Sequence, residues 1–569
     1  MAFIENLRDV INKYKDIDDF NRFLKKKAGL IDFLDSAQEF EEFKQFLHDF
    51  QFQQDKSRDM GDFQTPNHLT DKICEYLSNM QFNPEVIIEP TCGTGNFVIS
   101  GLKYFSTLTY VYCIEIQKKY KWVFLINLLL LALEQKIHTN IEFHCDNIFT
   151  HQFSAEFQQF LDENSGQLLV LGNPPWITNT ELSLLNSTNV PFKSNIKGDR
   201  GIEALTGKGN FDIAEFIILQ MIQQFSNRKG KVAMLCKTSV TKNLVRDFKR
   251  LNLKASNFKL LLIDSQKVFN INAEAGFFVA DLGISIDHSC IVSPLDNPDY
   301  PAKKFGWIND RFVSNIELYE KYNYIDGKSP FIWRHGIKHD ALKVMVLTIK
   351  DKIMLNGLNE IVDIETDLLY PYIKSSDLKK RVIKNINRQV IITQTSLNQD
   401  TEFIASAYPR LWDYLMNHSD YLDKRKSAIY KNRTRFSIFG IGEYVFAPYK
   451  IAISGFYKEP HFSIIFPINT KPAIPDDTCY YLFFNTFENA FFTWVLLNMD
   501  PIKDFLSSIV FLNSKRPYTK EILMRIDLSK LIKSITYQNF IDFYETHLKQ
   551  YLDYSFTKDH FALFLNSAF

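Results

Sequence analysis

The stretch LLVLGNPPW, residues 168–176, places an amide, two prolines and an indole directly after an apolar run. Proline has no N–H and restricts the residue before it to extended backbone, so the side-chain oxygen of Asn173 and a backbone carbonyl can be held as two fixed acceptors. Two such acceptors suit an exocyclic amino group, whose nitrogen they make pyramidal and able to attack a methyl group. Trp176 offers a π face for the ring that carries this amine. The chemistry requires neither a metal nor a covalent nucleophile.

A second stretch, VIIEPTCGTGNFVIS at 86–100, predicts a strand, a turn through Gly93 and Gly95, and a helix. Glycines let the backbone approach a ligand, and a helix N-terminus offers free N–H groups. Glu115 follows the next apolar run, twenty residues after Gly95, at the spacing of a carboxylate that binds ribose hydroxyls. Asp146 ends a further run, where its carboxylate can accept from an adenine amino group. Together they predict a site for an adenosine-containing cofactor.

Each of these residues also has a purely structural interpretation. Gly93 and Gly95 alone would fit an ordinary strand-turn-helix, with Glu115 as a charge at a strand end. Asp146 alone would fit a helix N-cap. NPPW alone would fit a proline-rich turn. The order of the four features along one chain favours the cofactor site over these interpretations.

The elements that must position these residues form an alternating pattern from about residue 60 to 290. Short apolar runs such as EVIIEP, YVYCIEI, IEFHC, LLVLGN, KVAMLC and KLLLID are separated by polar helical segments. This alternation predicts a mostly parallel, doubly wound α/β sheet with ligands at the carboxyl ends of its strands. We predict an N-terminal helical segment over 1–55, this α/β domain over 56–295, and a mixed α+β domain over 296–569.

Composition limits the class of protein. The chain has 569 residues, of which 46% are hydrophobic and 23% charged, as in globular proteins. The apolar run 122–133 is too short for a bilayer and predicts a buried helix, and the N-terminus lacks a secretory signal, so we expect a cytoplasmic protein without a membrane partner. Seven isolated cysteines predict neither disulfides nor a zinc site. Lys and Arg together equal Asp and Glu in number, so a nucleic-acid surface would require local clustering.

The segments GDFQTP, EPTCGTGNF, YCIEI, CDNIF and GNPPW, in this order, resemble the successive motifs of gamma-class N6-adenine DNA methyltransferases. The resemblance covers about residues 58–285 and implies a Rossmann-like methyltransferase domain that uses S-adenosyl-L-methionine. It implies catalysis by Asn173, Pro174, Pro175 and Trp176, and stacking of the flipped base between Trp176 and Phe269. The implied cofactor-binding residues are Phe63, Thr65, Pro66, Glu89, Thr91, Cys92, Gly93, Gly95, Glu115, Ile116, Asp146, Asn147, Asn173, Pro174 and Phe216.

The resemblance also implies that residues 296–569 recognise double-stranded DNA. A flipped base must leave the duplex, and contacts to the backbone offset that cost. The segment KRKSAIYKNRTRF at 424–436 is the strongest candidate, because basic side chains with interleaved aromatics suit phosphate and groove contacts. The predicted DNA-binding residues are Lys424, Arg425, Lys426, Lys431, Arg433 and Arg435. A solvated helix face is the alternative for such a charge run.

Several alternatives remain open at this level. Trp176 stands where many relatives have tyrosine or phenylalanine, and tryptophan is more familiar in N4-cytosine DNA methyltransferases. An RNA base methyltransferase, a methylase of a protein amide and an inactive binding protein are further alternatives. A bifunctional restriction enzyme is disfavoured, because only about 55 residues precede GDFQTP and they contain no PD...ExK pattern. We therefore expect a cognate restriction endonuclease, if one exists, to act as a separate protein, and we expect a monomer without a metal.

Overall fold

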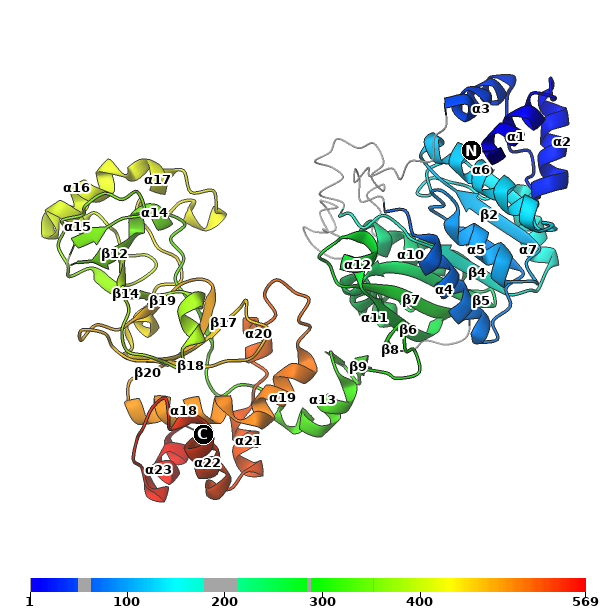
Figure 1. Ribbon diagram of the computed structural model, residues 1–569. Coiled ribbons are helices and arrows are strands. Elements are labelled where there is room, and N and C mark those ends of the chain that lie inside the picture. The colour runs from blue at the N-terminus through cyan, green and yellow to red at the C-terminus, as the bar shows by residue number, and fades with distance from the viewer. Residues whose placement is uncertain (1, 50–62, 179–211, 284–287, 352, 569) are drawn as a thin grey trace. The chain divides into compact units, whose positions relative to one another are not determined.

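The structure is a computed structural model that describes residues 2–49, 63–178, 212–283, 288–351 and 353–568 (Figure 1). The chain divides into two compact units, residues 1–312 and 313–569. Unit 1 and unit 2 below refer to these residues.

Unit 1 is built around a ten-stranded sheet in the order β10-β9-β8-β6-β7-β5-β4-β1-β2-β3. Strands β1 to β5 run parallel, whereas β7 pairs antiparallel with both β5 and β6. This confirms the predicted Rossmann-like, doubly wound α/β domain. The strands are β1 (Val86–Glu89), β2 (Tyr110–Ile114), β3 (Asn140–His144), β4 (Leu168–Gly172), β5 (Gly230–Lys237), β6 (Ala255–Ile263), β7 (Ala275–Leu282), β8 (Ser289–Pro294), β9 (Lys303–Ile308) and β10 (Arg311–Val313).

The strand runs recognised in the sequence are buried over most of their length, as a sheet covered by helices requires. The apolar run 122–133 lies in α6 and is packed against the sheet as predicted. The helices of unit 1 are α1 (Ala2–Ile11), α2 (Ile17–Ala28), α3 (Ala37–Asp49), α4 (Asn67–Asn79), α5 (Asn96–Tyr104), α6 (Lys118–Glu134), α7 (Ala155–Glu163), α10 (Ile213–Phe225), α11 (Thr238–Leu251) and α12 (Ser265–Phe269).

The N-terminal helices α1 to α3 belong to unit 1 and share its hydrophobic core. Phe43 packs against Trp122 of α6 with ring centroids 5.4 Å apart. The buried Lys121 ammonium pairs with Glu39 at 2.8 Å. Backbone hydrogen bonds of Gly29 and Ile31 with Ile141 cover the edge of the sheet at β3. The N-terminal segment is therefore an integral cover of α6 and β3.

The boundary predicted after residue 295 differs from the structural division after Phe312. Strand β8 pairs parallel with β6, and β9 then pairs antiparallel with β8, so residues 303–308 extend the sheet of unit 1. Strand β9 begins with the two exposed lysines Lys303 and Lys304 and continues with the buried Phe305 and Gly306, so it shows neither a continuous apolar run nor a regular alternation. That mixture hid the strand in the sequence.

Unit 2 has the expected mixed α+β architecture. Its two five-stranded sheets have the orders β11-β20-β17-β18-β15 and β13-β12-β16-β14-β19. The strands are β11 (Arg334–His335), β12 (Val346–Lys350), β13 (Ile353–Leu355), β14 (Leu369–Ile373), β15 (Val382–Ile383), β16 (Arg388–Ile391), β17 (Tyr449–Ser454), β18 (Ser463–Ile465), β19 (Ile474–Pro475) and β20 (Cys479–Phe484). Buried apolar side chains such as Ile391 and Leu411 form a core between the second sheet and the helices that cover it.

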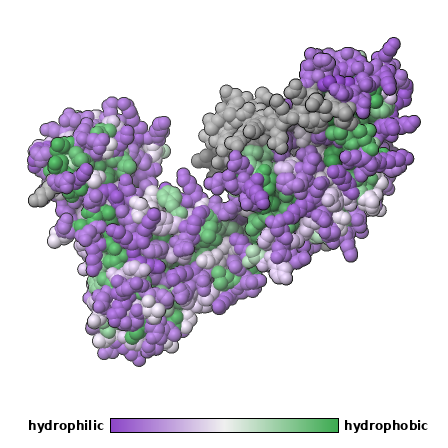
Figure 2. All heavy atoms as spheres, viewed as in Figure 1, coloured by the Kyte–Doolittle hydropathy of each residue, from purple (hydrophilic) through white to green (hydrophobic). Residues whose placement is uncertain are grey.

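The helices of unit 2 surround these sheets and form its C-terminal part (Figure 1). They are α13 (Ile316–Tyr322), α14 (Leu342–Met345), α15 (Phe403–Ala407), α16 (Pro409–Asn417), α17 (Ser419–Asp423), α18 (Phe487–Asn498), α19 (Asp500–Ile509), α20 (Lys520–Leu523), α21 (Leu528–Ser534), α22 (Tyr537–Phe543) and α23 (Lys558–Ala568). Short 3-10 or π turns are η2 (Asn323–Ile325), η3 (Ser375–Lys379), η4 (Ala428–Tyr430), η5 (Glu443–Phe446) and η6 (Tyr544–Leu548). Hydrophilic residues cover most of the face in Figure 2. Within the described residues, no helix is both long and apolar enough to cross a bilayer.

Candidate functional site

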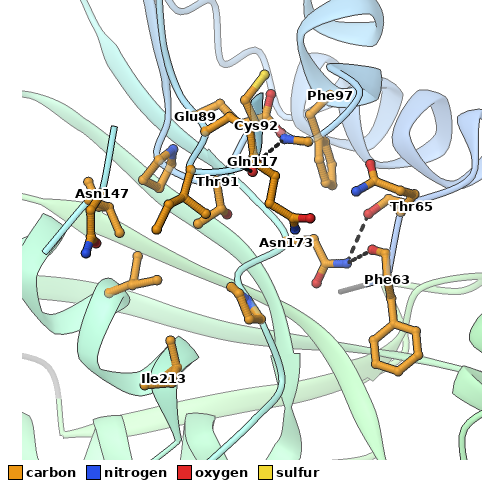
Figure 3. Close-up of a pocket in the computed structure, with 18 of the residues that line it drawn as sticks. Phe63, Thr65, Glu89, Thr91, Cys92, Phe97, Gln117, Asn147, Asn173 and Ile213 are labelled. Carbon is orange, nitrogen blue, oxygen red and sulfur yellow. Dashed lines mark hydrogen bonds between the residues drawn. The ribbon is translucent and has the colours of Figure 1, made fainter. Parts of the chain in front are cut away.

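A pocket of about 280 Å³ opens at the carboxyl ends of β1, β2, β3 and β4 (Figure 3). The strand order reverses between β1 and β4, and this is the point where doubly wound sheets bind their ligands. The pocket is lined by Phe63, Gln64, Thr65, Glu89, Pro90, Thr91, Cys92, Gly93, Asn96, Phe97, Glu115, Ile116, Gln117, Asp146, Asn147, Ile148, Phe149, Asn173, Pro175, Ile177, Ile213 and Ile217.

The glycine turn after β1 is formed as predicted, but its two glycines serve different purposes. Gly93 has a φ of 53° and lines the pocket, and a Cβ there would lie 2.5 Å from Oε1 of Gln64. Gly95 has a φ of 79°, and a Cβ there would lie 2.2 Å from the Phe124 ring. Gly95 is thus required for packing between the turn and α6, and the structure does not place it in the pocket lining.

Glu115 stands at the carboxyl end of β2, where the spacing predicted it. One carboxylate oxygen accepts from the Gly93 amide at 2.7 Å, and the other accepts from the Gln117 amide at 2.7 Å. The side chain is buried and lines the pocket. The carboxylate therefore fixes the glycine turn at the edge of the cavity.

Asp146 lies after β3 and lines the same pocket. Its carboxylate accepts from the Asn147 amide at 2.7 Å and contacts Nδ1 of His151 at 2.8 Å. Burial acts to raise the pKa of Asp146, but the hydrogen bonds from His151 and Asn147 lower it overall, so the carboxylate form is favoured. The residues after it form a turn, and α7 starts only at Ala155, so the helix N-cap interpretation is wrong.

Asn173 follows β4, and its amide is held in one orientation (Figure 3). The Nδ2 group donates to the Phe63 carbonyl at 3.0 Å and to Oγ1 of Thr65 at 3.1 Å. A carbonyl oxygen can only accept, so the atom that faces Phe63 must be the nitrogen. The opposite atom, Oδ1, is buried and has no hydrogen-bond partner among the described residues. The amide thus presents a free acceptor at the pocket.

Two further buried polar atoms of the pocket lining have no hydrogen-bond partner among the described residues: Oε2 of Glu89 and Oγ1 of Thr91. Burial raises the pKa of Glu89 well above its usual range despite a hydrogen bond from Cys92. Unpaired buried polar atoms are costly, and their concentration in one cavity indicates a polar ligand. Ile148, Ile213 and Ile217 give the cavity an apolar wall suited to a flat ring.

Three aromatic rings lie near the Asn173 amide. The Trp176 and Phe269 centroids are 5.3 Å apart at an interplanar angle of 73°, and Phe63 lies 6.2 Å from Trp176. Trp176 is buried, whereas Phe269 ends the short helix α12 and is half-buried. The structure therefore brings Trp176 and Phe269 together as predicted. Their edge-to-face contact leaves no stacking slot between them, so a base between the two rings requires them to separate.

The backbone after the two prolines is fixed by Lys237 at the end of β5. Its ammonium donates to the Trp176 carbonyl at 2.8 Å and to Asp212 at 2.8 Å. Asp212 also caps α10, and the Ile213 amide donates to the Ile177 carbonyl at 2.9 Å. The sequence analysis missed Lys237, because a lysine at a strand end has no distinctive pattern.

Most of the predicted cofactor residues line the pocket, but Pro66, Gly95, Pro174 and Phe216 do not. Phe216 packs edge-on against the pocket residue Phe149 at 5.4 Å, and the wall itself is formed by Ile213 and Ile217. Phe211, the other aromatic before this helix, lies outside the described residues. Lining residues that the sequence analysis missed include Gln64, Asn96, Phe97, Gln117, Ile148, Phe149 and Ile177.

The basic segment of unit 2 contains residues of two kinds. Arg425 donates to the carbonyls of Leu422, His339, Ser437 and Arg435 at 2.7 to 3.3 Å, and its guanidinium lies 3.9 Å from the Tyr430 ring. Arg435 is paired with Asp423 at 2.6 Å. Arg425 and Arg435 thus make contacts within the loop itself, and their predicted binding to DNA stays a prediction.

The other four predicted DNA-binding residues are exposed. Lys424 pairs with the exposed Asp420, and Arg433 donates to Asn398. Lys426 and Lys431 complete this set. Surface pairs of this kind contribute little and can exchange for phosphate. Lys424, Lys426, Lys431 and Arg433 are called the exposed basic set below.

Within the described residues, no group of three or more His, Cys, Asp or Glu side chains is arranged to hold a metal ion. All seven cysteines are free, and only Cys145 is exposed. The pocket is lined by side-chain amides, carboxyl groups, threonine hydroxyls, the Cys92 thiol and aromatic rings.

Comparison with known proteins gives the family. A sequence model of the N-6 DNA methylase family matches residues 41–248. The chain is similar to the type II methyltransferase M.NspV of Nostoc sp., with 37% identity over 481 residues that span 84% of this chain and 97% of that protein. In solved structures it is similar to the type IIL restriction-modification enzyme MmeI in complex with DNA, with 11% identity, a TM-score of 0.46, and coverage of 90% of this chain and 67% of that one. It is also similar to the type IIG restriction endonuclease BpuSI, with 13% identity, a TM-score of 0.38, and coverage of 90% and 65%. The match to M.NspV over nearly its whole length, together with the family model, confirms the resemblance seen in the motifs: the chain belongs to the N-6 DNA methylase family and is an adenine-specific DNA methyltransferase.

Proposed function

We propose that the pocket of unit 1 binds S-adenosyl-L-methionine and that Asn173 presents the N6 amino group of a flipped-out adenine to its methyl group. The observation that carries this proposal is that the nitrogen and the oxygen of the Asn173 amide have different environments. Its nitrogen is fixed by Phe63 and Thr65, while its buried oxygen has no partner within the described residues. An acceptor held in this way matches an exocyclic amine that must lose its planarity.

The residues of the pocket fit such a cofactor. Glu115 is a carboxylate of the pocket lining that can accept from ribose hydroxyls, and Asp146 can accept from the adenine amino group beside the wall of Ile148, Ile213 and Ile217. The unpaired oxygens of Glu89 and Thr91 lie in the same pocket and suit the charged amino-acid end. When bound, the cofactor supplies an electrophilic methyl group on a sulfonium.

The residues of the chain then act on the target base. The Asn173 oxygen and the Pro174 carbonyl accept hydrogen bonds from the two N–H groups of N6, which makes the nitrogen pyramidal and frees its lone pair. The amine held in this way would lie in line with the methyl group that a bound cofactor supplies, and N6 would give up one proton to solvent after the transfer. Trp176 and Phe269 hold the ring once they have separated to admit it.

Unit 2 is proposed to recognise the DNA duplex. Flipping a base costs a few kcal/mol, which phosphate contacts and stacking offset. The exposed basic set supplies cations for those contacts, and the loop that carries it is held by Arg425. The base sequence that is read depends on side chains that meet base edges in the complex.

We further propose a role in a type II restriction-modification system, because the relative M.NspV is described as a type II methyltransferase. The methylated site would then be protected from a cognate restriction endonuclease that is a separate protein. The enzyme acts as a monomer on one strand at a time, in the cytoplasm where the genomic DNA lies.

The test is a methyl-transfer assay with isotopically labelled S-adenosyl-L-methionine and mixed-sequence duplex DNA. The wild type should yield labelled N6-methyldeoxyadenosine. Asn173→Ala should lose transfer by at least about a hundredfold, because a mispositioned reacting group costs that much, while cofactor affinity stays within a few-fold. Near-normal turnover of Asn173→Ala would remove this residue from the mechanism. Labelled N4-methyldeoxycytidine, or label only on RNA, would overturn the assignment of the substrate.

A further inference from the structure

The orientation of the catalytic amide depends on the segment 63–65. Both acceptors of the Asn173 nitrogen belong to it: the Phe63 carbonyl and the Thr65 hydroxyl. If this segment shifts, the amide can rotate, and the free oxygen no longer faces the pocket. Whatever anchors residues 63–65 therefore controls where that oxygen lies.

Thr94 in the glycine turn and Asn96 directly after it anchor this segment by hydrogen bonds. Nδ2 of Asn96, the first residue of α5, donates to the Thr65 carbonyl at 2.7 Å. Oε1 of Gln64 accepts from both the amide and the hydroxyl of Thr94 at 3.0 Å. Pro66 follows Thr65 without lining the pocket, and it restricts Thr65 to extended backbone. Thr65 is therefore held at its carbonyl by Asn96 and bonded through its hydroxyl to Asn173.

Helix capping does not account for the Asn96 side chain. The N-cap of α5 is Gly95, which has no side chain, and no side-chain capping bond is formed there. The Asn96 amide instead reaches across to a segment 31 residues earlier in the chain. A donor placed in this way serves the position of Thr65.

We infer that Asn96 is a positioning residue for methyl transfer, which acts through Thr65 on the orientation of Asn173. The chain of hydrogen bonds runs from Asn96 to the Thr65 backbone and from the Thr65 hydroxyl to the Asn173 nitrogen. Because Asn96 also lines the pocket next to Gly93 and Thr94, it connects the cofactor-binding turn to the amide that presents the base. The inference rests on the proposed catalytic role of Asn173.

The experiment compares Asn96→Asp with Asn164→Asp in the full-length protein, using kcat and the KM for S-adenosyl-L-methionine with duplex DNA. Asn96→Asp keeps the shape of the side chain but places an oxygen against the Thr65 carbonyl. Asn164 is the matched control, since its Nδ2 also donates to a backbone carbonyl, that of Phe160 at 2.8 Å, but at the end of α7 and outside the pocket lining. Circular dichroism checks folding, and Asn96→Ala repeats the test without an added charge.

We expect kcat of Asn96→Asp to fall about tenfold to a hundredfold, while the KM for the cofactor changes less than about threefold. The control Asn164→Asp should keep kcat within about twofold at saturating cofactor. In a Thr65→Val background, Asn96→Asp should cause a smaller fold-loss than in the wild type, because the two substitutions disrupt one chain of contacts.

An unchanged kcat, a change in KM alone, or fully multiplicative losses with Thr65→Val would overturn the inference. Asn173→Ala in the same series separates this failure from failure of the proposed function. If Asn173→Ala is inactive and Asn96→Asp is fully active, only the role of Asn96 is wrong. If Asn173→Ala is active, the proposed mechanism itself is wrong.

Discussion

The two kinds of arginine and lysine in the segment 424–435 should respond differently to mutation. Arg425→Ala removes a guanidinium that donates to four backbone carbonyls and stacks on Tyr430. Removal of the exposed basic set takes away charge without touching these contacts. We therefore expect Arg425→Ala to destabilise unit 2, and the combined alanine substitution of the exposed basic set to weaken DNA binding in a folded protein.

The magnitude for Arg425 follows from its contacts. Hydrogen bonds to a charged group contribute about 1.5 to 3 kcal/mol each, but four bonds from one guanidinium are not additive, and the residue is only partly buried. A cation–π contact adds about 0.5 to 2 kcal/mol. A loss of about 3 to 5 kcal/mol is expected for Arg425→Ala. For a unit of this size it should lower the melting temperature by roughly 10 °C in calorimetry of the full chain.

The magnitude for the exposed basic set follows from counterion release. Each phosphate contact contributes about 0.9 to the slope of log affinity against log salt concentration, so the loss of all four reduces that slope by up to about 3.6. Fluorescence anisotropy with a labelled duplex at several salt concentrations measures it. An unchanged slope would move the DNA surface elsewhere, and an unchanged melting temperature of Arg425→Ala would refute the structural role of that residue.

Two further predictions concern other groups. Glu115→Gln leaves one of the two backbone N–H groups that Glu115 binds without an acceptor, at a cost of about 1 to 3 kcal/mol. Calorimetric titration should therefore show that the affinity for the cofactor falls about tenfold. An unchanged affinity would contradict the role of Glu115. Burial, with Arg425 and Lys374 nearby, lowers the pKa of His339 to about 4. The unfolded chain therefore binds more protons between pH 6.5 and 4, so the stability from neutral His339 is complete above about pH 6.5 and is lost as the pH falls toward 4. After correction for the intrinsic rate, amide hydrogen exchange in unit 2 should become faster from pH 7 to pH 5, and this increase should be smaller in His339→Gln. An equal increase in the wild type and in His339→Gln would refute this prediction.

The residues that sequence analysis placed well are those in contiguous motifs at strand ends. Glu89, Glu115 and Asp146 lie at the ends of or directly after β1, β2 and β3, and all three line one pocket. The spacing of a doubly wound fold brings successive strand ends to one edge of the sheet, so position in the chain is enough to predict position in the site. Asn173 was predicted from the same rule.

The residues that were missed depend on side-chain direction. Phe216 was expected at the cofactor, but the wall is formed by Ile213 and Ile217, which are four residues apart and share a helix face. Phe216 points to Phe149 instead. Arg425 was expected on the DNA surface, and it turns inward to its own loop. Nothing in the order of residues states the rotation of a helix or the direction of an arginine in a loop.

The different environments of the amide nitrogen and oxygen explain why asparagine, rather than aspartate, suits position 173 in this structure. An aspartate would place an oxygen against the Phe63 carbonyl, which can only accept, and the two would repel each other. Its charge would also be desolvated where the amide oxygen is buried. The amide meets both demands at once, because its nitrogen satisfies the carbonyl and its oxygen remains available to the base. The hydrogen bonds of the Asn173 nitrogen therefore fix the position of the oxygen that we propose as the acceptor for the base.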